Sequence, residues 1–278
     1  MSPPVLHHRL DGPAGAPALI LGPSLGTSMA LWEAQLPTLA RFFRVLRFDL
    51  PGHGGSGAGL LRDPNAGRTT VEDLASLVLS LADRHDWDRF HYAGISLGGA
   101  IGACLAARHP RRVVSLALVC SSASFGAPGS WHERAELVRL KGTAPLLATS
   151  PGRWFAAASF AESALGSRLL RNLAEADPVG YAACCDALAA LDLGPCLADI
   201  IAPTLVVGGS RDRATPLEHT YELRDGIPCA DLDIIPCGHL AAEQPEALGT
   251  ALMRHLVASR AGPHRITRTP PVQGRALP

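Results

Sequence analysis

Residues 90–108 read FHYAGISLGGAIGACLAAR, and this stretch decides the fold. The apolar run 90–93 predicts a buried strand, and the Ala- and Leu-rich run after Ser96 predicts a helix. Between them, Gly94-Ile95-Ser96-Leu97-Gly98 matches the pattern G-x-S-x-G. We therefore expect a sharp strand-to-helix turn with Ser96 at its tip. Because glycine is abundant in the chain, an ordinary glycine-rich turn with an incidental serine is the alternative.

The rest of the chain favours a parallel sheet, because short apolar runs alternate with longer segments of helical period. We expect parallel strands at residues 18–22, 44–48, 90–93, 113–119, 204–207 and 231–235, and an antiparallel edge strand at residues 5–10. We expect helices at residues 30–40, 70–84, 97–109, 217–224 and 244–259. The sequence thus predicts the α/β class, with a mostly parallel sheet flanked by helices.

The alternation of strands and helices stops between residues 124 and 199. This stretch indicates helical segments broken by glycine and proline. We interpret it as a helical cap inserted between two parts of one core, residues 1–123 and residues 200–259. The tail, residues 260–278, is rich in Pro and Arg and has no apolar period, so we expect it to be disordered.

A serine hydroxyl is a weak nucleophile until a base takes its proton, and the base needs an acid to orient it. His239 is the best placed histidine, because it follows the last predicted strand and strand ends collect catalytic groups. Asp212 follows strand 204–207 and gives the chain order Ser, Asp, His. Asp231 and Asp233 are competitors within or beside a strand. The alternative is that Asp212 or His239 has only a structural role in its loop.

Two backbone N–H groups are expected to bind the oxyanion of a tetrahedral intermediate. One is the N–H of Leu97, at the start of the helix after the serine. The other belongs to the loop at residues 22–27, where position favours Leu25. His53, in the loop at residues 49–54, follows a different strand from the three candidate catalytic residues. We interpret it as a structural turn residue.

Composition excludes several classes of function. The chain has 278 residues, 47% of them hydrophobic, and its formal net charge is +0, so neither a nucleic acid nor an acidic membrane is an expected partner. No apolar run is long enough to span a bilayer, and no secretion signal is evident, so we expect a cytoplasmic protein. The 7 cysteines show no C-x-x-C spacing, which favours free thiols over disulfides or a metal site. The sequence leaves open whether the chain forms a homo-oligomer.

Taken together, these residues resemble the α/β-hydrolase superfamily over most of the chain, and the 3-oxoadipate enol-lactonases of aromatic-acid catabolism more closely. The motifs that carry the closer resemblance are Ser24-Leu25-Gly26-Thr27 followed by Trp32, residues 94–99 (GISLGG), Arg153-Trp154-Phe155, residues 177–185 (DPVGYAACC) and residues 212–216 (DRATP). Two positions depart from that family. Pro23 stands where these lactonases usually carry Asn, and Pro51 stands where Arg is common, which leaves room for a different substrate.

The resemblance implies an α/β-hydrolase fold and a catalytic triad of Ser96, Asp212 and His239, with no metal and no organic cofactor. Ser96 would attack the carbonyl of a small-molecule lactone, 3-oxoadipate enol-lactone, and the ring oxygen would leave as an enol that rearranges to a ketone. Water activated by His239 would then release 3-oxoadipate. The N–H groups of Leu25 and Leu97 would hold the oxyanion.

The substrate of these lactonases carries a free carboxylate, which a guanidinium group can bind with two hydrogen bonds. Arg134 and Arg153 in the cap are the candidates, and Trp154 is expected to form an apolar pocket wall. Two other functions remain open. One is a carboxylesterase or another small-lactone hydrolase with the same triad. The other is a ligand-binding homologue that has lost turnover.

Overall fold

The computed structural model describes residues 5–260, and these residues form one seven-stranded sheet in the order β1-β3-β2-β4-β5-β6-β7. The strands are β1 (His8–Asp11), β2 (Ala18–Gly22), β3 (Arg44–Phe48), β4 (Phe90–Ile95), β5 (Val113–Val119), β6 (Thr204–Gly209) and β7 (Ala230–Ile235). Strand β1 pairs antiparallel with β3, and the other neighbours pair in parallel. The mostly parallel sheet predicted from sequence is confirmed.

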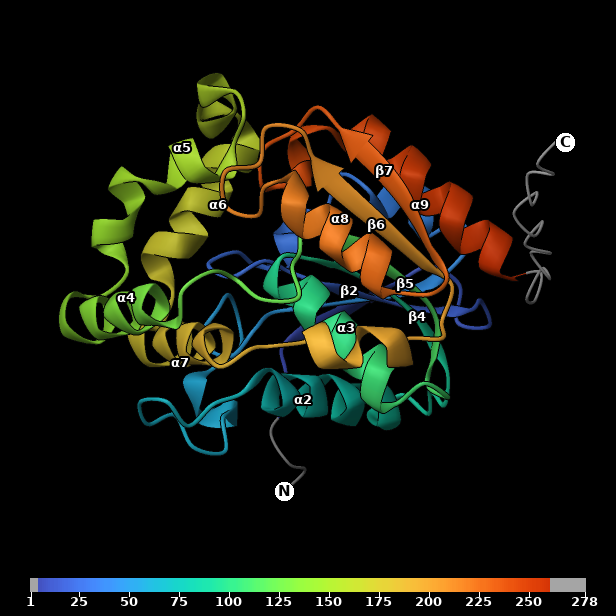
Figure 1. Cartoon of the computed structure of the whole chain (residues 1–278), viewed down its shortest axis with the longest axis horizontal. Helices are drawn as coiled ribbons and strands as arrows, with labels where there is room; N and C mark the ends of the chain where they lie inside the picture. Colours follow the sequence, from blue (N-terminus) through green and yellow to red (C-terminus); the bar gives the residue numbers. More distant parts are fainter. Residues whose placement is uncertain (1–4, 261–278) are drawn as a thin grey trace, which may run out of the picture.

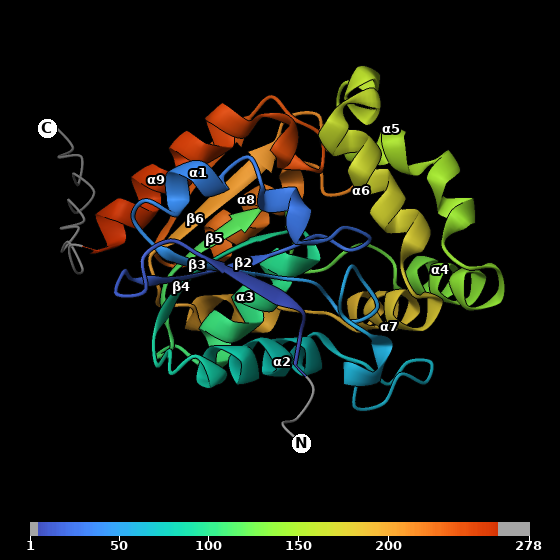
Figure 2. The ribbon, with the colours of Figure 1, turned by 180° about the vertical axis from the view of Figure 1, so that it is seen from behind.

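Helices cover both faces of this sheet (Figures 1 and 2). The core helices are α1 (Leu36–Leu39), α2 (Val71–Arg84), α3 (Leu97–Arg108), α8 (Leu217–Gly226) and α9 (Pro245–Arg260). Short 3-10 helices are η1 (Met29–Trp32), η2 (Ala58–Leu60) and η6 (Ala241–Glu243). Helices α1 and α9 lie on the face seen in Figure 2, whereas α3 and α8 lie on the opposite face. Helix α2 packs against α3.

Between β5 and β6 the chain forms the cap helices, which gather beyond the tips of the parallel strands (Figure 1). They are α4 (Pro128–Lys141), η3 (Ala144–Ala148), α5 (Ser150–Trp154), η4 (Ala158–Glu162), α6 (Ala164–Glu175) and α7 (Pro178–Ala189). The 3-10 helix η5 (Gly194–Asp199) follows them before β6 and packs against α3 and α8 of the core. Asp186 of α7 is buried and pairs with Arg139 of α4, which holds these two cap helices together. The helical insertion therefore sits where the strand ends place functional loops.

Three expectations about the elements need correction. The predicted helix at 30–40 is instead η1 followed by the four-residue α1, because Pro37 in the first turn of α1 has no N–H with which to continue a helix from upstream. Strand β1 begins at His8 and not at residue 5. Arg260 ends α9, and the rest of the predicted disordered tail lies outside the described residues.

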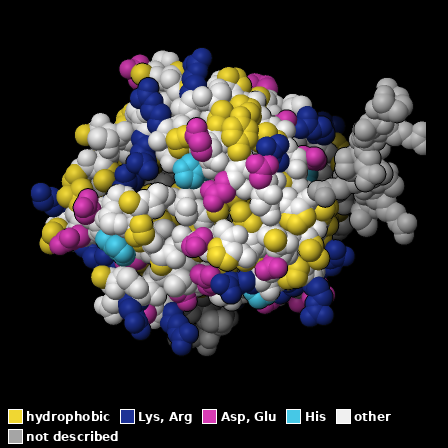
Figure 3. Space-filling view, viewed as in Figure 1, with side chains coloured by type: hydrophobic (Ala, Val, Ile, Leu, Met, Phe, Trp, Pro, Cys, Tyr) yellow, Lys and Arg dark blue, Asp and Glu magenta, His cyan; other side chains and the backbone are white. Residues whose placement is uncertain are grey.

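The surface shows no bias toward one charge on the face drawn in Figure 3, where Lys and Arg side chains are interspersed with Asp and Glu. This agrees with the formal net charge of +0. Within residues 5–260, no helix combines the length and the apolar character needed to cross a membrane.

The turn between β4 and α3 depends on a very close approach of backbone segments. A Cβ atom added at Gly94 would collide with the carbonyl group of Gly98, and one added at Gly98 would collide with the carbonyl group of Gly22 in β2. Helix α3 therefore packs on the sheet with its first turn against bare backbone. No other amino acid fits these two positions without displacing that turn.

We expect Gly98→Ala to lower the free energy of unfolding by about 1–3 kcal/mol, because the added methyl group must push α3 away from β2. The matched control is Gly249→Ala in α9, where an added Cβ meets nothing within 4 Å. That substitution should raise stability by about 0.5–1 kcal/mol. Urea denaturation followed by circular dichroism measures both, and equal effects at the two sites would contradict the packing argument.

Candidate active site

Ser96 stands at the tip of the turn between β4 and α3 in a left-handed backbone conformation, with φ 55° and ψ −119°. Its N–H donates to the carbonyl of Val119 at 2.9 Å, and the Ser121 hydroxyl donates to the Ser96 carbonyl at 2.9 Å. Non-glycine residues rarely adopt this conformation, so the surrounding hydrogen bonds must hold it. The serine is thereby presented at the first turn of a helix.

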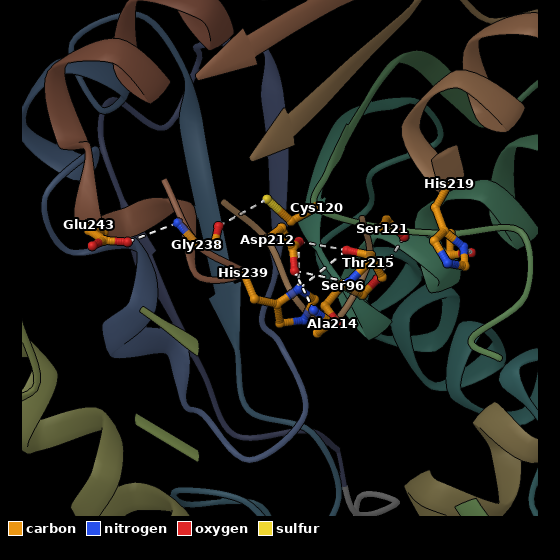
Figure 4. Close-up of polar contacts among 11 residues, drawn as sticks. Ser96, Cys120, Ser121, Asp212, Ala214, Thr215, His219, Gly238, His239 and Glu243 are labelled. Atoms are coloured by element: carbon orange, nitrogen blue, oxygen red, sulfur yellow. Dashed lines mark hydrogen bonds and ion pairs between the residues drawn. The ribbon is translucent and has the colours of Figure 1, made fainter. Parts of the chain in front are cut away.

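Asp212 and His239 meet beside this turn, on the loops that follow β6 and β7 (Figure 4). The Nδ1 atom of His239 lies 2.9 Å from Oδ2 of Asp212. The carboxylate also accepts the hydroxyl of Thr215 at 2.7 Å and the N–H groups of Ala214 at 2.7 Å and Thr215 at 2.9 Å. The carboxylate is thus oriented by four donors, and it orients the imidazole in turn.

The charge of Asp212 is maintained by this environment. Burial by itself would raise the pKa of the Asp212 carboxyl, but attraction to His239 and the hydrogen bonds from His239 and Thr215 hold it below its ordinary value. An ionised Asp212 accepts the Nδ1 proton of His239 in a hydrogen bond, which we assign from this contact. The Nε2 atom of the ring is then the free basic nitrogen.

Ser96 and His239 line one narrow cavity between the core and the cap. The core residues of its wall are Ser24, Leu25, Ser96, Ala214 and His239. The cap side consists of Phe125, Trp131, Arg134, Ser150, Arg153, Trp154 and Tyr181. Among the described residues no hydrogen bond joins the Ser96 hydroxyl to the imidazole. Such bonds are often formed only when substrate is bound.

The two residues expected to supply the oxyanion donors lie close to Ser96. Leu97 is the first residue of α3, so its N–H has no acceptor within the helix. Leu25 lies in a turn closed by hydrogen bonds from the N–H and the hydroxyl of Thr27 to the Ser24 carbonyl, at 3.1 and 2.8 Å. Both leucines are buried, and Leu25 lines the cavity with Ser96.

The two cap arginines expected to bind substrate both reach this cavity. The guanidinium carbon of Arg134 lies 5.1 Å from the ring centre of Trp131, and that of Arg153 lies 5.9 Å from the same ring. Neither arginine forms an ion pair with an acidic side chain of residues 5–260. Burial lowers the pKa of Arg153, and the nearby charge of Arg134 lowers it further. Trp154, the expected pocket wall, is buried beside them.

Comparison with known proteins agrees with this architecture. The family model described as "alpha/beta hydrolase fold" matches residues 17–245. The chain belongs to the α/β-hydrolase family. Within this family it resembles 3-oxoadipate enol-lactonase 1 of Acinetobacter baylyi, with 32% identity over 86% of this chain and 88% of the relative. A putative carbamate hydrolase RutD of Rhizobium rhizogenes is 31% identical over 90% of this chain and 96% of the relative.

Solved structures of related hydrolases have the same fold. The enol-lactonase from Burkholderia xenovorans superimposes with a TM-score of 0.86 at 34% identity, covering 91% of this chain and 96% of that one. A hydrolase from Pseudomonas aeruginosa gives 0.83 at 36% identity, covering 90% and 93%. The resemblance to enol-lactonases read from the sequence is confirmed, and the protein is an α/β hydrolase.

His53 of this hydrolase is a structural residue, as its loop position predicts, and the structure shows what it holds. Its Nδ1 atom lies 2.9 Å from the Pro51 carbonyl, and its Nε2 atom accepts the N–H of Gly26 at 3.0 Å. The ring also stacks on Tyr181 of the cap, with 5.8 Å between centroids. Burial lowers the pKa of His53, although the Pro51 carbonyl opposes this shift. The neutral ring therefore fixes the loop that carries Leu25.

Sequence reasoning missed three residues that shape the site. Thr215 donates its hydroxyl to Asp212, while Trp131 and Tyr181 form cavity walls of the hydrolase. Thr215 and Tyr181 belong to motifs shared with the lactonases, and membership in these motifs was the sequence feature that could have pointed to them. Trp131 lies in a helix with no evident apolar period, so no pattern in the sequence pointed to it. In the part of the chain described, no group of three or more His, Cys, Asp or Glu side chains could hold a metal ion.

We expect the stability of the hydrolase to fall with acid partly through His53. In an unfolded chain its pKa is about 6.5. Because burial lowers the pKa in the folded state, the unfolded state binds the proton first as the pH falls below about 6.5, and folding loses free energy. His53→Gln, which keeps an acceptor for Gly26, should make the free energy of unfolding fall less between pH 7.5 and pH 5.5.

Urea denaturation at the two pH values measures this difference, with His109→Gln at an exposed position as the control. The same acid-dependent loss in His53→Gln and in the wild type would show that His53 titrates normally in the folded protein.

Proposed function

We propose that this hydrolase opens the ring of a small enol-lactone that carries a free carboxylate, such as 3-oxoadipate enol-lactone, and uses Ser96 as its nucleophile. One observation carries the proposal. Two cap arginines, which form no ion pair with an acidic side chain of residues 5–260, line the same cavity as Ser96 and His239. Half-buried like charges are unfavourable unless an anion joins them, and a carboxylate suits a guanidinium group well. The similarity to enol-lactonases supports this choice, which implies a role in aromatic-acid breakdown.

In the first step, Nε2 of His239 takes the proton of the Ser96 hydroxyl, and the serine oxygen bonds to the lactone carbonyl carbon. The N–H groups of Leu25 and Leu97 bind the oxyanion. When the carbonyl re-forms, the bond to the ring oxygen breaks, and the imidazolium returns its proton to the leaving enolate. The free enol becomes the ketone, which makes ring opening hard to reverse.

In the second step, water replaces the serine. His239 takes a proton from water, the resulting hydroxide attacks the acyl ester, and Ser96 leaves with the proton from the imidazolium. Asp212 remains ionised throughout, because its four hydrogen bonds, one of them from the imidazole of His239, stabilise the anion. Its role is to orient the ring and to stabilise the imidazolium.

We expect wild-type protein to consume the enol-lactone, seen as a loss of ultraviolet absorbance, and Ser96→Ala to lose at least about 10³-fold in kcat because no acyl-enzyme can form. A small carbamate and a neutral 4-nitrophenyl ester are tested in parallel, since the relatives include putative carbamate hydrolases. Rapid turnover of carbamate or ester with none of enol-lactone would keep the triad and reject the lactone. An active Ser96→Ala would reject the nucleophile.

We expect Arg153→Gln to raise KM for the anionic lactone about tenfold or more and to change kcat little, because it removes a charge-assisted contact to a part of the substrate that does not react. Arg134→Gln is measured beside it to show how the two arginines share the carboxylate. The matched control is Arg171→Gln, at an exposed arginine of α6. If KM changes equally in Arg171→Gln and Arg153→Gln, the carboxylate is not bound by the cavity arginines.

A further inference from the structure

Glu243 joins the cap to the loop that carries His239. Its Oε2 atom accepts the N–H of Gly238 at 2.9 Å and that of Ala156 at 3.0 Å. Its Oε1 atom accepts the N–H of Ala157 at 2.8 Å. Gly238 immediately precedes His239, and Ala156 and Ala157 follow the end of the cap helix α5. One carboxylate therefore bridges two segments that are more than 80 residues apart in sequence; Figure 4 shows the contact with Gly238.

A second set of contacts joins the same two segments. The N–H of Leu240 donates to the carbonyl of Trp154 at 3.0 Å. A Cβ atom added at Gly238 would lie 2.6 Å from the nitrogen of Ala156 and 2.7 Å from the carbonyl oxygen of Trp154. The two loops are thus pressed together backbone to backbone. On one side of this contact lies His239, and on the other lie Trp154 and its neighbour Arg153.

We propose that Glu243 is a positioning residue that sets the location of the Arg153–Trp154 wall relative to His239. The inference rests on the proposed function, in which Arg153 binds the substrate carboxylate while His239 acts at the lactone carbonyl. Glu243 does not line the cavity and touches no reacting atom. It acts through the two segments whose N–H groups it accepts.

The physical basis is the strength and the geometry of this bridge. Hydrogen bonds from N–H groups to an ionised carboxylate are shorter and stronger than those between neutral groups. Without the carboxylate, three backbone N–H groups lose their acceptor, and the cap loop can move away from Gly238. A displacement of about 1 Å between a binding group and a catalytic group can cost about 10²-fold in rate. The distance between Arg153 and His239 would then no longer match the substrate.

The test compares an anionic and a neutral ester of similar size, 4-nitrophenyl hemisuccinate and 4-nitrophenyl butyrate. We expect Glu243→Ala to lower kcat on both esters, because His239 is less well placed. We expect it also to raise KM about tenfold for the anionic ester alone, because Arg153 has moved. The preference for the anionic ester therefore falls. Glu246→Ala, an exposed glutamate in the first turn of α9, is the matched control and should behave as wild type.

A double-mutant cycle separates positioning from general stabilisation. In an Arg153→Gln background, Glu243→Ala should not lower the anionic preference any further. If Glu243 only stabilised the fold, Glu243→Ala would lower the melting temperature but leave the ratio of the two kcat/KM values unchanged, and that result would overturn the inference. Should Glu243→Ala fail to fold, Glu243→Gln, which keeps one acceptor oxygen, is judged by the same ratio.

The ester series also separates this inference from the proposed substrate. A wild-type protein that prefers the anionic ester but leaves the enol-lactone intact would reject the lactone, while Glu243 is still judged by the ester ratio. A wild-type protein that consumes the lactone, combined with an unchanged ratio in Glu243→Ala, would reject the role of Glu243 alone. A wild-type protein without anionic preference would also reject it, since Arg153 would then bind no carboxylate.

Discussion

The close contact of helix α3 with strands β2 and β4 is the constraint on which the rest of the structure depends. Backbone atoms meet at Gly94 and Gly98, where no side chain fits. The chain must therefore turn sharply between them, and Ser96 takes its left-handed conformation as a consequence. The cost of that conformation is met by the hydrogen bonds around the turn and by the burial of the sheet on both faces. Every other part of the site is arranged around this fixed point.

Charge is the second constraint, because the site holds ionised groups out of water. Asp212 remains charged since four donors face it, one of them the imidazole of His239. Arg134 and Arg153 have no such acidic partner among the described residues, and both lie over the ring of Trp131 instead. Groups of the core thus stabilise the negative charge of Asp212. The two guanidinium groups of the cap have no such compensation, and a bound anion would supply it. This asymmetry supports the proposed anionic substrate over a neutral ester.

The cap and the core meet through backbone groups held by buried or half-buried side chains. His53 accepts an N–H from the loop of Leu25 and stacks on Tyr181 of the cap. Glu243 accepts N–H groups from the cap and from the loop of His239. Both residues follow strand ends, close to the candidate triad. A site assembled from loops in this way needs such links, because loops have few hydrogen bonds of their own.

The sequence by itself determined the parallel strands, the turn at Ser96 and the chain order of the candidate triad, because these depend on local apolar runs and on glycine spacing. It did not determine the break at Pro37 that divides the expected helix 30–40. The apolar content of this segment indicated one continuous helix, although Pro37 lacks the N–H that such a helix needs. Only the tertiary structure decided that Trp131 and both arginines share a cavity with Ser96, and that Glu243 bridges core and cap. Those relations join residues far apart in sequence, and no local pattern records which distant backbone groups a side chain will meet.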